Sequence, residues 1–259
     1  MLYIGNENHK SNWVWYMISL KNKIVVITGA SRGIGAAICR HMAAEGARLV
    51  LTGRNMKRLK ATAVSLGLDK KDYHIVRADI TKKAEMKKIV SSARRKFGRI
   101  DIFINNAGVG IHKPVIELTE KQFDQIFNTN LKAVYFSFLE LIPLYRRQGG
   151  GQIINISSGA GRMGVPGLAA YSSSKAALNV FSEAVAGEVR NDSIKISVLS
   201  PASTDTNFMS NMSRKSKTPS KAALKLTVDE VAEAVVFMAR QNKNAWTSMA
   251  DIRPLLIKR

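Results

Sequence analysis

The sequence predicts an α/β fold in which a mainly parallel sheet is doubly wound, with helices on both faces. Short apolar runs rich in β-branched residues alternate along the chain with segments whose apolar residues have helical spacing. Strands separated by helices of ten or more residues form βαβ units, and right-handed crossovers then cover both faces of the sheet. No Pro- or Ser-rich linker and no internal repeat interrupts this alternation, so a single domain is expected.

The individual elements follow from these two patterns. Strands are expected at residues 24–28, 48–52, 74–77, 102–105, 152–157, 194–199 and, with a weaker pattern, 250–257. Helices are expected at residues 34–45, 55–66, 82–97, 119–144, 168–190 and 228–240. Strand and helix alternate throughout, which predicts a Rossmann-type sandwich formed by residues 20–259.

Residues 1–19 stand outside this alternation. The stretch lacks the basic start and the long apolar centre of a secretory signal. We expect an N-terminal extension that could lack ordered structure. The aromatic residues Trp13, Trp15 and Tyr16 are the counterargument, because such side chains tend to pack against a protein surface.

The chain is strongly basic, with 40 Lys and Arg against 19 Asp and Glu and a formal net charge of +21. Such a surplus raises the question of a nucleic-acid or acidic-membrane partner. The cations at residues 82–99 lie on a helical pattern opposite apolar positions, which is typical of a solvated helix face. No RNA-binding aromatic motif or zinc-finger spacing accompanies them, so a nucleic-acid partner is not expected.

Other compositional features favour an ordinary cytoplasmic protein. The single cysteine, Cys39, excludes an intramolecular disulfide. The four histidines have no ligand spacing with it or with carboxylates, so no metal site is expected. No apolar run approaches the roughly 18 residues of a membrane span.

A glycine-rich turn joins the first expected strand to the first helix. Its three glycines are spaced G-x-x-x-G-x-G, which permits a tight turn and close approach of a pyrophosphate to the positive helix N-terminus. A merely compact loop is the alternative. The expected nucleotide contacts in this turn are Gly29, Ser31, Arg32, Gly33, Ile34 and Gly35.

Tyr171 and Lys175 are four residues apart in an expected helix and therefore share one face. A free phenol has a pKa of ~10, and a nearby ammonium that lowers it by about 3 units must supply roughly 4 kcal/mol. Tyr171 could then act as a general acid on a carbonyl oxygen. Ser158, at the end of an expected strand, could donate a hydrogen bond to that same oxygen.

Six motifs in this order resemble those of the short-chain dehydrogenase/reductase family, and the resemblance continues to near the C-terminus. They are the glycine turn, Asp79-Ile80, Asn105-Asn106-Ala107-Gly108, Asn130, Ser158 with Tyr171-x-x-x-Lys175, and Pro201-Ala202-Ser203-Thr204-Asp205-Thr206. The resemblance implies that Asn130, Ser158, Tyr171 and Lys175 are catalytic. Asn130 would hold a water of the proton relay, and Lys175 would also hold the nicotinamide ribose. It implies further cofactor contacts at Asp79, Ile80, Asn106, Ala107, Gly108, Pro201, Thr204 and Thr206.

The choice of cofactor depends on the end of the second strand. NAD-specific enzymes usually carry an acid there for the ribose 2′-hydroxyl, whereas this chain has Gly53. Arg54 could bind a 2′-phosphate, and Arg32 could pair with it from the other side. These residues predict NADP(H).

Two departures from the family pattern concern assembly and backbone. Ala202 replaces the usual glycine of the P-G segment, where its methyl group would constrain the backbone. The C-terminus lacks the familiar G-x-x-x-x-V-D-G-G ending, which often builds subunit contacts. A homodimer or homotetramer is expected, but tetramer assembly through that end is in doubt.

The resemblance extends most closely to NADP-dependent 3-oxoacyl-carrier-protein reductases and related carbonyl reductases. We therefore expect NADPH-dependent reduction of a small-molecule carbonyl, with a 3-oxoacyl thioester on coenzyme A or acyl carrier protein as the first candidate. A small polyol, a hydroxy acid, another ketone and a non-catalytic NADP-binding regulator are the alternatives. Residues 207–227 are expected to form a substrate lid, whose cations Arg214, Lys215, Lys217, Lys221 and Lys225 would steer an anionic substrate.

Overall fold

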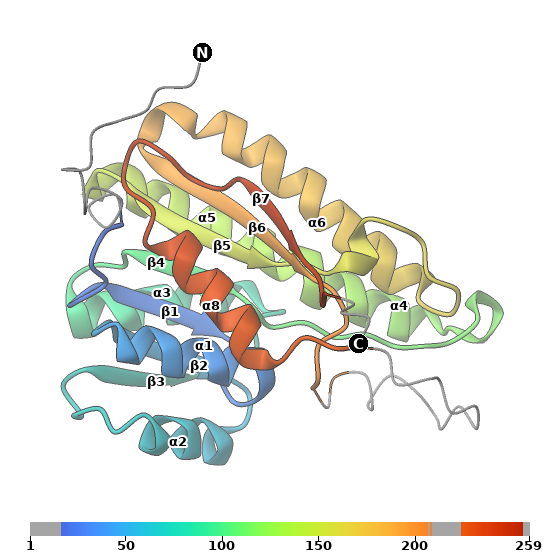
Figure 1. The fold of residues 1–259 in the computed structure, drawn as a ribbon, viewed down its shortest axis with the longest axis horizontal. Helices are drawn as coiled ribbons and strands as arrows, with labels where there is room; N and C mark the ends of the chain where they lie inside the picture. Colours follow the sequence, from blue (N-terminus) through green and yellow to red (C-terminus); the bar gives the residue numbers. More distant parts are fainter. Residues whose placement is uncertain (1–16, 207, 209–223, 256–259) are drawn as a thin grey trace, which may run out of the picture.

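The computed structural model describes residues 17–206, 208 and 224–255. A seven-stranded parallel sheet forms the centre, in the order β3-β2-β1-β4-β5-β6-β7, which confirms the doubly wound Rossmann-type fold (Figure 1). The strands are β1 (Ile24–Thr28), β2 (Arg48–Gly53), β3 (Tyr73–Arg77), β4 (Ile102–Asn105), β5 (Gly151–Ile156), β6 (Ile194–Pro201) and β7 (Met249–Ile252).

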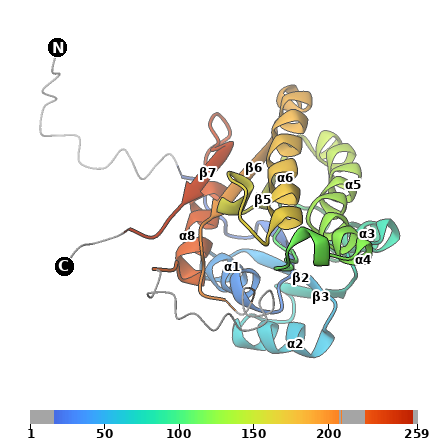
Figure 2. The ribbon, with the colours of Figure 1, turned by 90° about the vertical axis from the view of Figure 1, so that its right-hand side faces the viewer.

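Helices cover both faces of this sheet (Figure 2). The helices α1 (Gly33–Ala44), α2 (Met56–Ser65) and α8 (Val228–Ala239) share one apolar core with the sheet. The helices α3 (Lys83–Phe97), α5 (Ala133–Gln148) and α6 (Ala169–Glu188) share the other. Successive residues of β1 alternate between the two cores, with Val25 in the first and Val26 in the second. Every position of β1 is buried because both faces are covered.

The prediction of a single helix at residues 119–144 is wrong. The structure divides it into α4 (Glu120–Phe127), a π-helical turn (Asn128–Lys132) and α5. The helix also continues to Gln148 and ends at Gly149, whose φ of 80° is the left-handed conformation favoured by glycine. The apolar spacing of this segment did not separate the π turn from the α-helices on either side of it.

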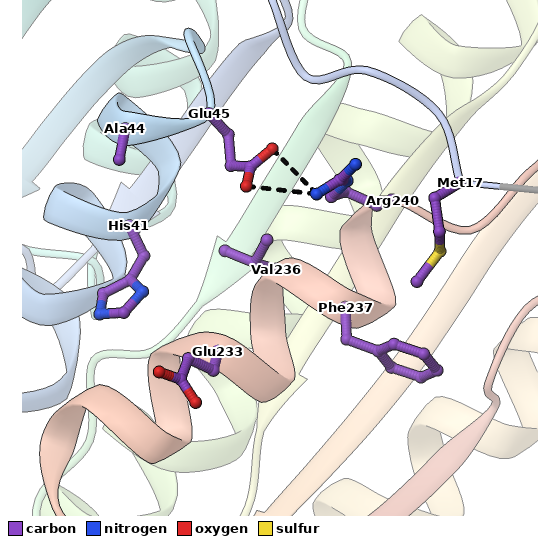
Figure 3. Close-up of a pocket in the computed structure, with 8 residues that line it drawn as sticks. All are labelled: Met17, His41, Ala44, Glu45, Glu233, Val236, Phe237 and Arg240. Carbon is purple, nitrogen blue, oxygen red and sulfur yellow. Dashed lines mark hydrogen bonds and ion pairs between the residues drawn. The ribbon is translucent and has the colours of Figure 1, made fainter. Parts of the chain in front are cut away.

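The chain enters the described fold beside α8. Met17 forms an antiparallel bridge with Gln241, and the Ile18 amide donates to the Arg240 carbonyl at 2.6 Å. Met17 and Arg240 border a hollow of about 300 Å³ between α1 and α8, where Arg240 forms an ion pair of 3.2 Å with Glu45 (Figure 3). Residues 1–16 lie outside the described residues, so the N-terminal extension stays a prediction. None of the helices in the described ranges is long and apolar enough to cross a membrane.

Candidate active site

The expected site residues gather at one edge of the sheet, where the carboxyl ends of its parallel strands meet. The glycine turn follows β1, Arg54 follows β2, Asp79 lies just beyond β3, and Ser158 follows β5. The strand order reverses between β1 and β4, which lie side by side in the sheet. A reversal of this kind opens a crevice outside the strand ends, where α/β proteins bind ligands.

The glycine turn leaves room for an anion at the N-terminus of α1. A Cβ at Gly35 would overlap the Gly29 carbonyl oxygen and lie 2.5 Å from Asn106 Nδ2, so only glycine fits there. The N-cap residue of α1 is Arg32, whose side chain makes no capping hydrogen bond, and the first turn holds no acid. Its backbone N–H groups are therefore free of the side-chain acceptors that usually satisfy them, and a pyrophosphate fits this position.

The turn is held in place by Thr28, a residue that the sequence analysis missed. Its hydroxyl accepts hydrogen bonds from the amides of Asn106 and Ala107 at 2.9 and 3.1 Å. The Asn106 side chain in turn donates to the Thr28 carbonyl at 2.8 Å. These bonds join the glycine turn to the Asn106–Gly108 stretch across neighbouring strands. The only sequence signal was that Thr28 is the last residue of its strand.

Asn130 lies in the π-helical turn and is buried, with 1% of its surface exposed. Its side-chain oxygen accepts from the Val109 amide at 2.9 Å. Its Nδ2 donates to the Val109 carbonyl at 2.9 Å and to Ser174 Oγ at 3.0 Å. Asn130 thus joins the loop after β4 to α6. Its expected role in holding a water stays a prediction.

Tyr171 and Ser158 face each other at the crevice. Tyr171 is 8% exposed, and its ring lies 5.9 Å from that of Phe208, between ring centroids. Burial raises the pKa of Tyr171 above its ordinary value of 10, and a side-chain hydrogen bond with Ser158 acts in the opposite direction. Burial has the larger effect, so the pKa of Tyr171 is raised, contrary to the expected lowering.

Lys175 lies one helical turn beyond Tyr171 and is buried. Its Nζ donates to the Ile156 carbonyl of β5 at 2.8 Å. Burial lowers the pKa of Lys175 from 10.5 to about 8. The ammonium is therefore still charged at neutral pH, and it is held against the strand backbone close to Gly108 and Asn130. A Cβ at Gly108 would lie 3.7 Å from Lys175 Nζ and 3.3 Å from Asn130 Oδ1.

We predict that Lys175→Met stabilises the protein at neutral pH. The lowered pKa means that the folded state binds fewer protons than the unfolded state between pH 8 and 10.5, so wild-type stability rises over that window. Below pH 8 the buried charge of Lys175 lowers the free energy of unfolding by about 3 kcal/mol, which Lys175→Met would recover. The variant also loses the hydrogen bond to Ile156, which takes back about 1 kcal/mol. Urea unfolding of both proteins from pH 7 to 10 should show Lys175→Met more stable by about 1–3 kcal/mol, with a gap that narrows as pH rises. Lys121→Met, on the exposed surface, is the control, and a gap independent of pH would contradict the prediction.

Arg32 and Arg54 are both exposed and follow the adjacent strands β1 and β2. No acid stands between β2 and α2, since Gly53 ends the strand and Asn55 caps the helix by accepting from the Arg58 amide. Asp79 Oδ1 accepts from the Thr81 amide and hydroxyl at 3.1 and 2.8 Å, which shapes the turn after β3. Two exposed arginines thus follow β1 and β2 at this edge of the sheet.

The segment after β6 closes the other side of the crevice. A Cβ at Gly33 would lie 3.7 Å from Thr206 Cγ2, so this segment reaches the glycine turn. Pro201 ends β6, and Thr204 pairs with Leu226. Ala202 is not among the described residues with positive φ, so its methyl group is accommodated without strain. Residues 207 and 209–223 of the expected lid lie outside the described residues.

Comparisons with known proteins agree with this arrangement. The model of the short chain dehydrogenase family matches residues 23–217. The chain belongs to the short-chain dehydrogenase family. It is 30% identical over 239 residues to an uncharacterized oxidoreductase of Staphylococcus aureus, covering 92% of this chain and 100% of that one. An oxidoreductase of Sarocladium schorii is 36% identical over 187 residues, 72% of this chain and 74% of that one.

Among solved structures, a metagenomic short-chain oxidoreductase in complex with NADP is similar, with a TM-score of 0.78 and 31% identity. The match covers 92% of this chain and 100% of that chain. This short-chain dehydrogenase is therefore an oxidoreductase that acts on CH–OH or C=O groups. The resemblance inferred from its motifs is confirmed at the level of the family.

Proposed function

We propose that this short-chain dehydrogenase reduces the carbonyl of a small molecule to a secondary alcohol with NADPH. The observation that carries the proposal is the grouping of Tyr171, Ser158 and Lys175 at the crevice beside the glycine turn. The Tyr171 phenol is buried and hydrogen-bonded to Ser158, and Lys175 lies on the next turn of α6. A non-catalytic regulator would not need this combination.

The three side chains have distinct roles in the proposed reaction. A nicotinamide cofactor held by the glycine turn would supply the hydride for the carbonyl carbon. Tyr171 donates its proton to the carbonyl oxygen, and its raised pKa keeps that proton in place at neutral pH. Ser158 donates a hydrogen bond to the same oxygen as negative charge develops there. Lys175, charged below pH 8, would stabilise the phenolate that remains and would hold the nicotinamide ribose.

The preference for NADPH rests on Arg32 and Arg54. Two exposed guanidinium groups at neighbouring strand ends, with Gly53 in place of an acid, suit a 2′-phosphate. The similar metagenomic oxidoreductase is a complex with NADP, which supports the assignment. The glycine turn would bind the pyrophosphate, and Asp79 with Ile80 would border the adenine.

The surroundings of Tyr171 favour a substrate with an apolar substituent. Leu168 packs against Tyr171, and Ala160, Val165 and Phe208 pack around the pair. A small polyol would bury its hydroxyl groups there without partners. A 3-oxoacyl thioester, whose acyl chain is apolar, therefore remains the first candidate, and an apolar ketone is the second.

Loss of NADPH absorbance tests the function directly. The purified protein is mixed with NADPH and with 3-oxoacyl thioesters, aliphatic and cyclic ketones, and α-keto acids in turn. We expect turnover of at least one thioester or apolar ketone. Tight NADPH binding without turnover of any carbonyl would instead indicate the non-catalytic regulator.

We also propose that the expected homo-oligomer forms through α5 and α6 and not through the C-terminus. A mostly apolar groove of about 670 Å³ is lined by Phe127, Leu131, Tyr135, Ala177, Val180, Phe181 and Ala184, together with Asn128 and Lys132. Tyr135 and Val180 are 43% and 67% exposed at its surface. A second copy, related by a two-fold axis, would present the same apolar face to this one and remove both side chains from water.

We predict that Val180→Glu converts the oligomer into smaller species. Two copies of the new carboxylate would meet across the two-fold axis in an apolar interface, which is strongly unfavourable. Light scattering after size-exclusion chromatography measures the mass. Val64→Glu is the matched control, because Val64 is 77% exposed on α2, outside the groove. A wild-type mass equal to one chain would contradict the proposed interface.

A further inference from the structure

One face of α6 is polar although it is buried against the sheet. Tyr171, Lys175, Asn179 and Ser182 recur at intervals of three or four residues, which places them in a row along the helix. All four are at most 8% exposed. Polar side chains in such a position need partners, because an unpaired buried polar group is costly.

The partners of this row lie along β5 and the turn that follows it. Lys175 Nζ donates to the Ile156 carbonyl at 2.8 Å. Ser157 Oγ donates to Asn179 Oδ1 at 2.6 Å, and Asn155 Nδ2 donates to Ser182 Oγ at 2.8 Å. Tyr171 pairs with Ser158 at the end of the row. Four turns of α6 are thus bonded to a stretch of four residues, Asn155–Ser158, at the end of β5 and just after it, and these bonds restrict how the helix lies along the strand.

Asn179 differs from the other members of the row because it bonds to both sides of the turn formed by residues 158–161, here called the Ser158 turn. Before Ser158, it accepts from Ser157 Oγ; after Ser158, its Nδ2 donates to the Gly161 carbonyl at 3.3 Å. The turn between them is closed by the Gly161 amide, which donates to the Ser158 carbonyl at 2.8 Å. Asn179 is 4% exposed, so no bulk water replaces these bonds when its amide is removed.

The Ser158 turn packs so closely against α6 that it has little room to move toward the helix. A Cβ at Gly161 would lie 2.9 Å from the Lys175 carbonyl carbon, so the turn contacts the helix backbone directly beside Lys175. The Ala160 amide donates to Ser158 Oγ at 3.2 Å, which leaves the Ser158 hydroxyl proton available for another acceptor. A small displacement of the turn would therefore move the Ser158 hydroxyl relative to Tyr171.

We propose that Asn179 is a positioning residue that holds the Ser158 turn on α6 and thereby sets the Ser158 hydroxyl opposite Tyr171. The inference rests on the proposed function, since it assigns to Asn179 an effect on catalysis through Ser158. Asn179 itself pairs with Ser157 and Gly161 and not with the reacting groups. Displacing a catalytic group by about 1 Å can cost about a hundredfold in rate.

The test compares Asn179→Ala with Ser182→Ala on the substrate found by the NADPH screen. Both substitutions remove a buried hydrogen-bonding side chain from the same face of α6, but Ser182 pairs with Asn155 and not with the Ser158 turn. We expect Asn179→Ala to lower kcat about tenfold to a hundredfold, with KM and the NADPH Kd changed less than about threefold. Ser182→Ala should lower the melting temperature and leave kcat within about threefold of wild type.

Ser157→Ala provides a milder second variant should Asn179→Ala fold poorly. In Asn179→Ala the hydrogen bond from Ser157 is already lost, and Ser157 Oγ keeps only a bond of 3.4 Å to the Lys175 carbonyl, so the double variant should lose little more kcat than Asn179→Ala alone. The inference would be overturned if the double variant lost kcat by the product of the two single losses. A wild-type kcat for Asn179→Ala would overturn it too. Equal loss of kcat in Asn179→Ala and Ser182→Ala would also overturn it, because general loosening of α6 would then suffice.

A pH profile of alcohol oxidation gives a further readout. In that direction Tyr171 must lose its proton, and the Ser158 hydrogen bond lowers the pKa of Tyr171. Asn179→Ala should shift the acidic limb of the profile to higher pH, in the same direction as Ser158→Ala, while Ser182→Ala does not; an unshifted limb would contradict the inference. Lys175, the other titratable group on this face, is unchanged in all three variants. Full turnover by Ser158→Ala and Tyr171→Phe would instead refute the proposed function itself.

Discussion

Tyr171→Phe is expected to abolish turnover while leaving the affinity for NADPH nearly unchanged. The substitution removes the proton donor but keeps the ring that packs against Leu168 and Phe208. A general acid contributes typically about 10²–10⁴-fold to a rate, so its removal should lower kcat by a factor of that size. kcat from NADPH absorbance and the Kd from quenching of protein fluorescence measure the two quantities separately.

Tyr73→Phe is the control for this experiment, because Tyr73 begins β3, at the opposite end of that strand from the crevice. It should leave kcat and the NADPH Kd unchanged. If Tyr171→Phe retained most of the wild-type rate, Tyr171 would not be the acid. A large loss of NADPH affinity would show instead that the phenol hydroxyl contributes mainly to cofactor binding.

The double variant Arg32→Ala/Arg54→Ala is expected to lose most of its preference for NADPH over NADH. Each arginine would contribute a charge-assisted hydrogen bond to the 2′-phosphate, and losing one commonly costs about 1.5–3 kcal/mol, roughly tenfold to a hundredfold. NADH lacks that phosphate, so its affinity should change little. Titration of both cofactors against both proteins gives the ratio of Kd values.

The matched control is Arg94→Ala/Arg95→Ala, which removes the same charge from the exposed face of α3. It should weaken NADPH binding far less, because the effect of Arg32 and Arg54 is local. Equal losses of NADPH and NADH affinity in the Arg32/Arg54 variant would mean that these arginines do not recognise the phosphate. Equal losses in the two double variants would indicate a general effect of net charge.

Much of the fold could be predicted because its signals are local. The run Ile24–Thr28 is apolar at nearly every position, as expected of a strand buried on both faces, and the helical spacing of Met86, Ile89 and Val90 places one face of α3 in the core. Element ends were less accurate: the helix expected to end at residue 144 continues to Gln148, where Gly149 can adopt a positive φ. The π-helical turn at Asn130 escaped prediction because it depends on bonds to Val109 and Ser174.

The sequence by itself determined the family, the order of strands and helices along the chain, and which polar residues follow each strand. All of these depend on the spacing of residues that are close together in the sequence. Only the tertiary structure decided how those residues act on one another. The pKa of Tyr171 is raised and not lowered because burial exceeds the other influences on its phenol. Lys175 donates to Ile156, and Asn179 holds the Ser158 turn, through contacts between residues about twenty positions apart. Such contacts depend on how closely α6 packs along β5, and the spacing of neighbouring residues in the sequence does not predict that packing.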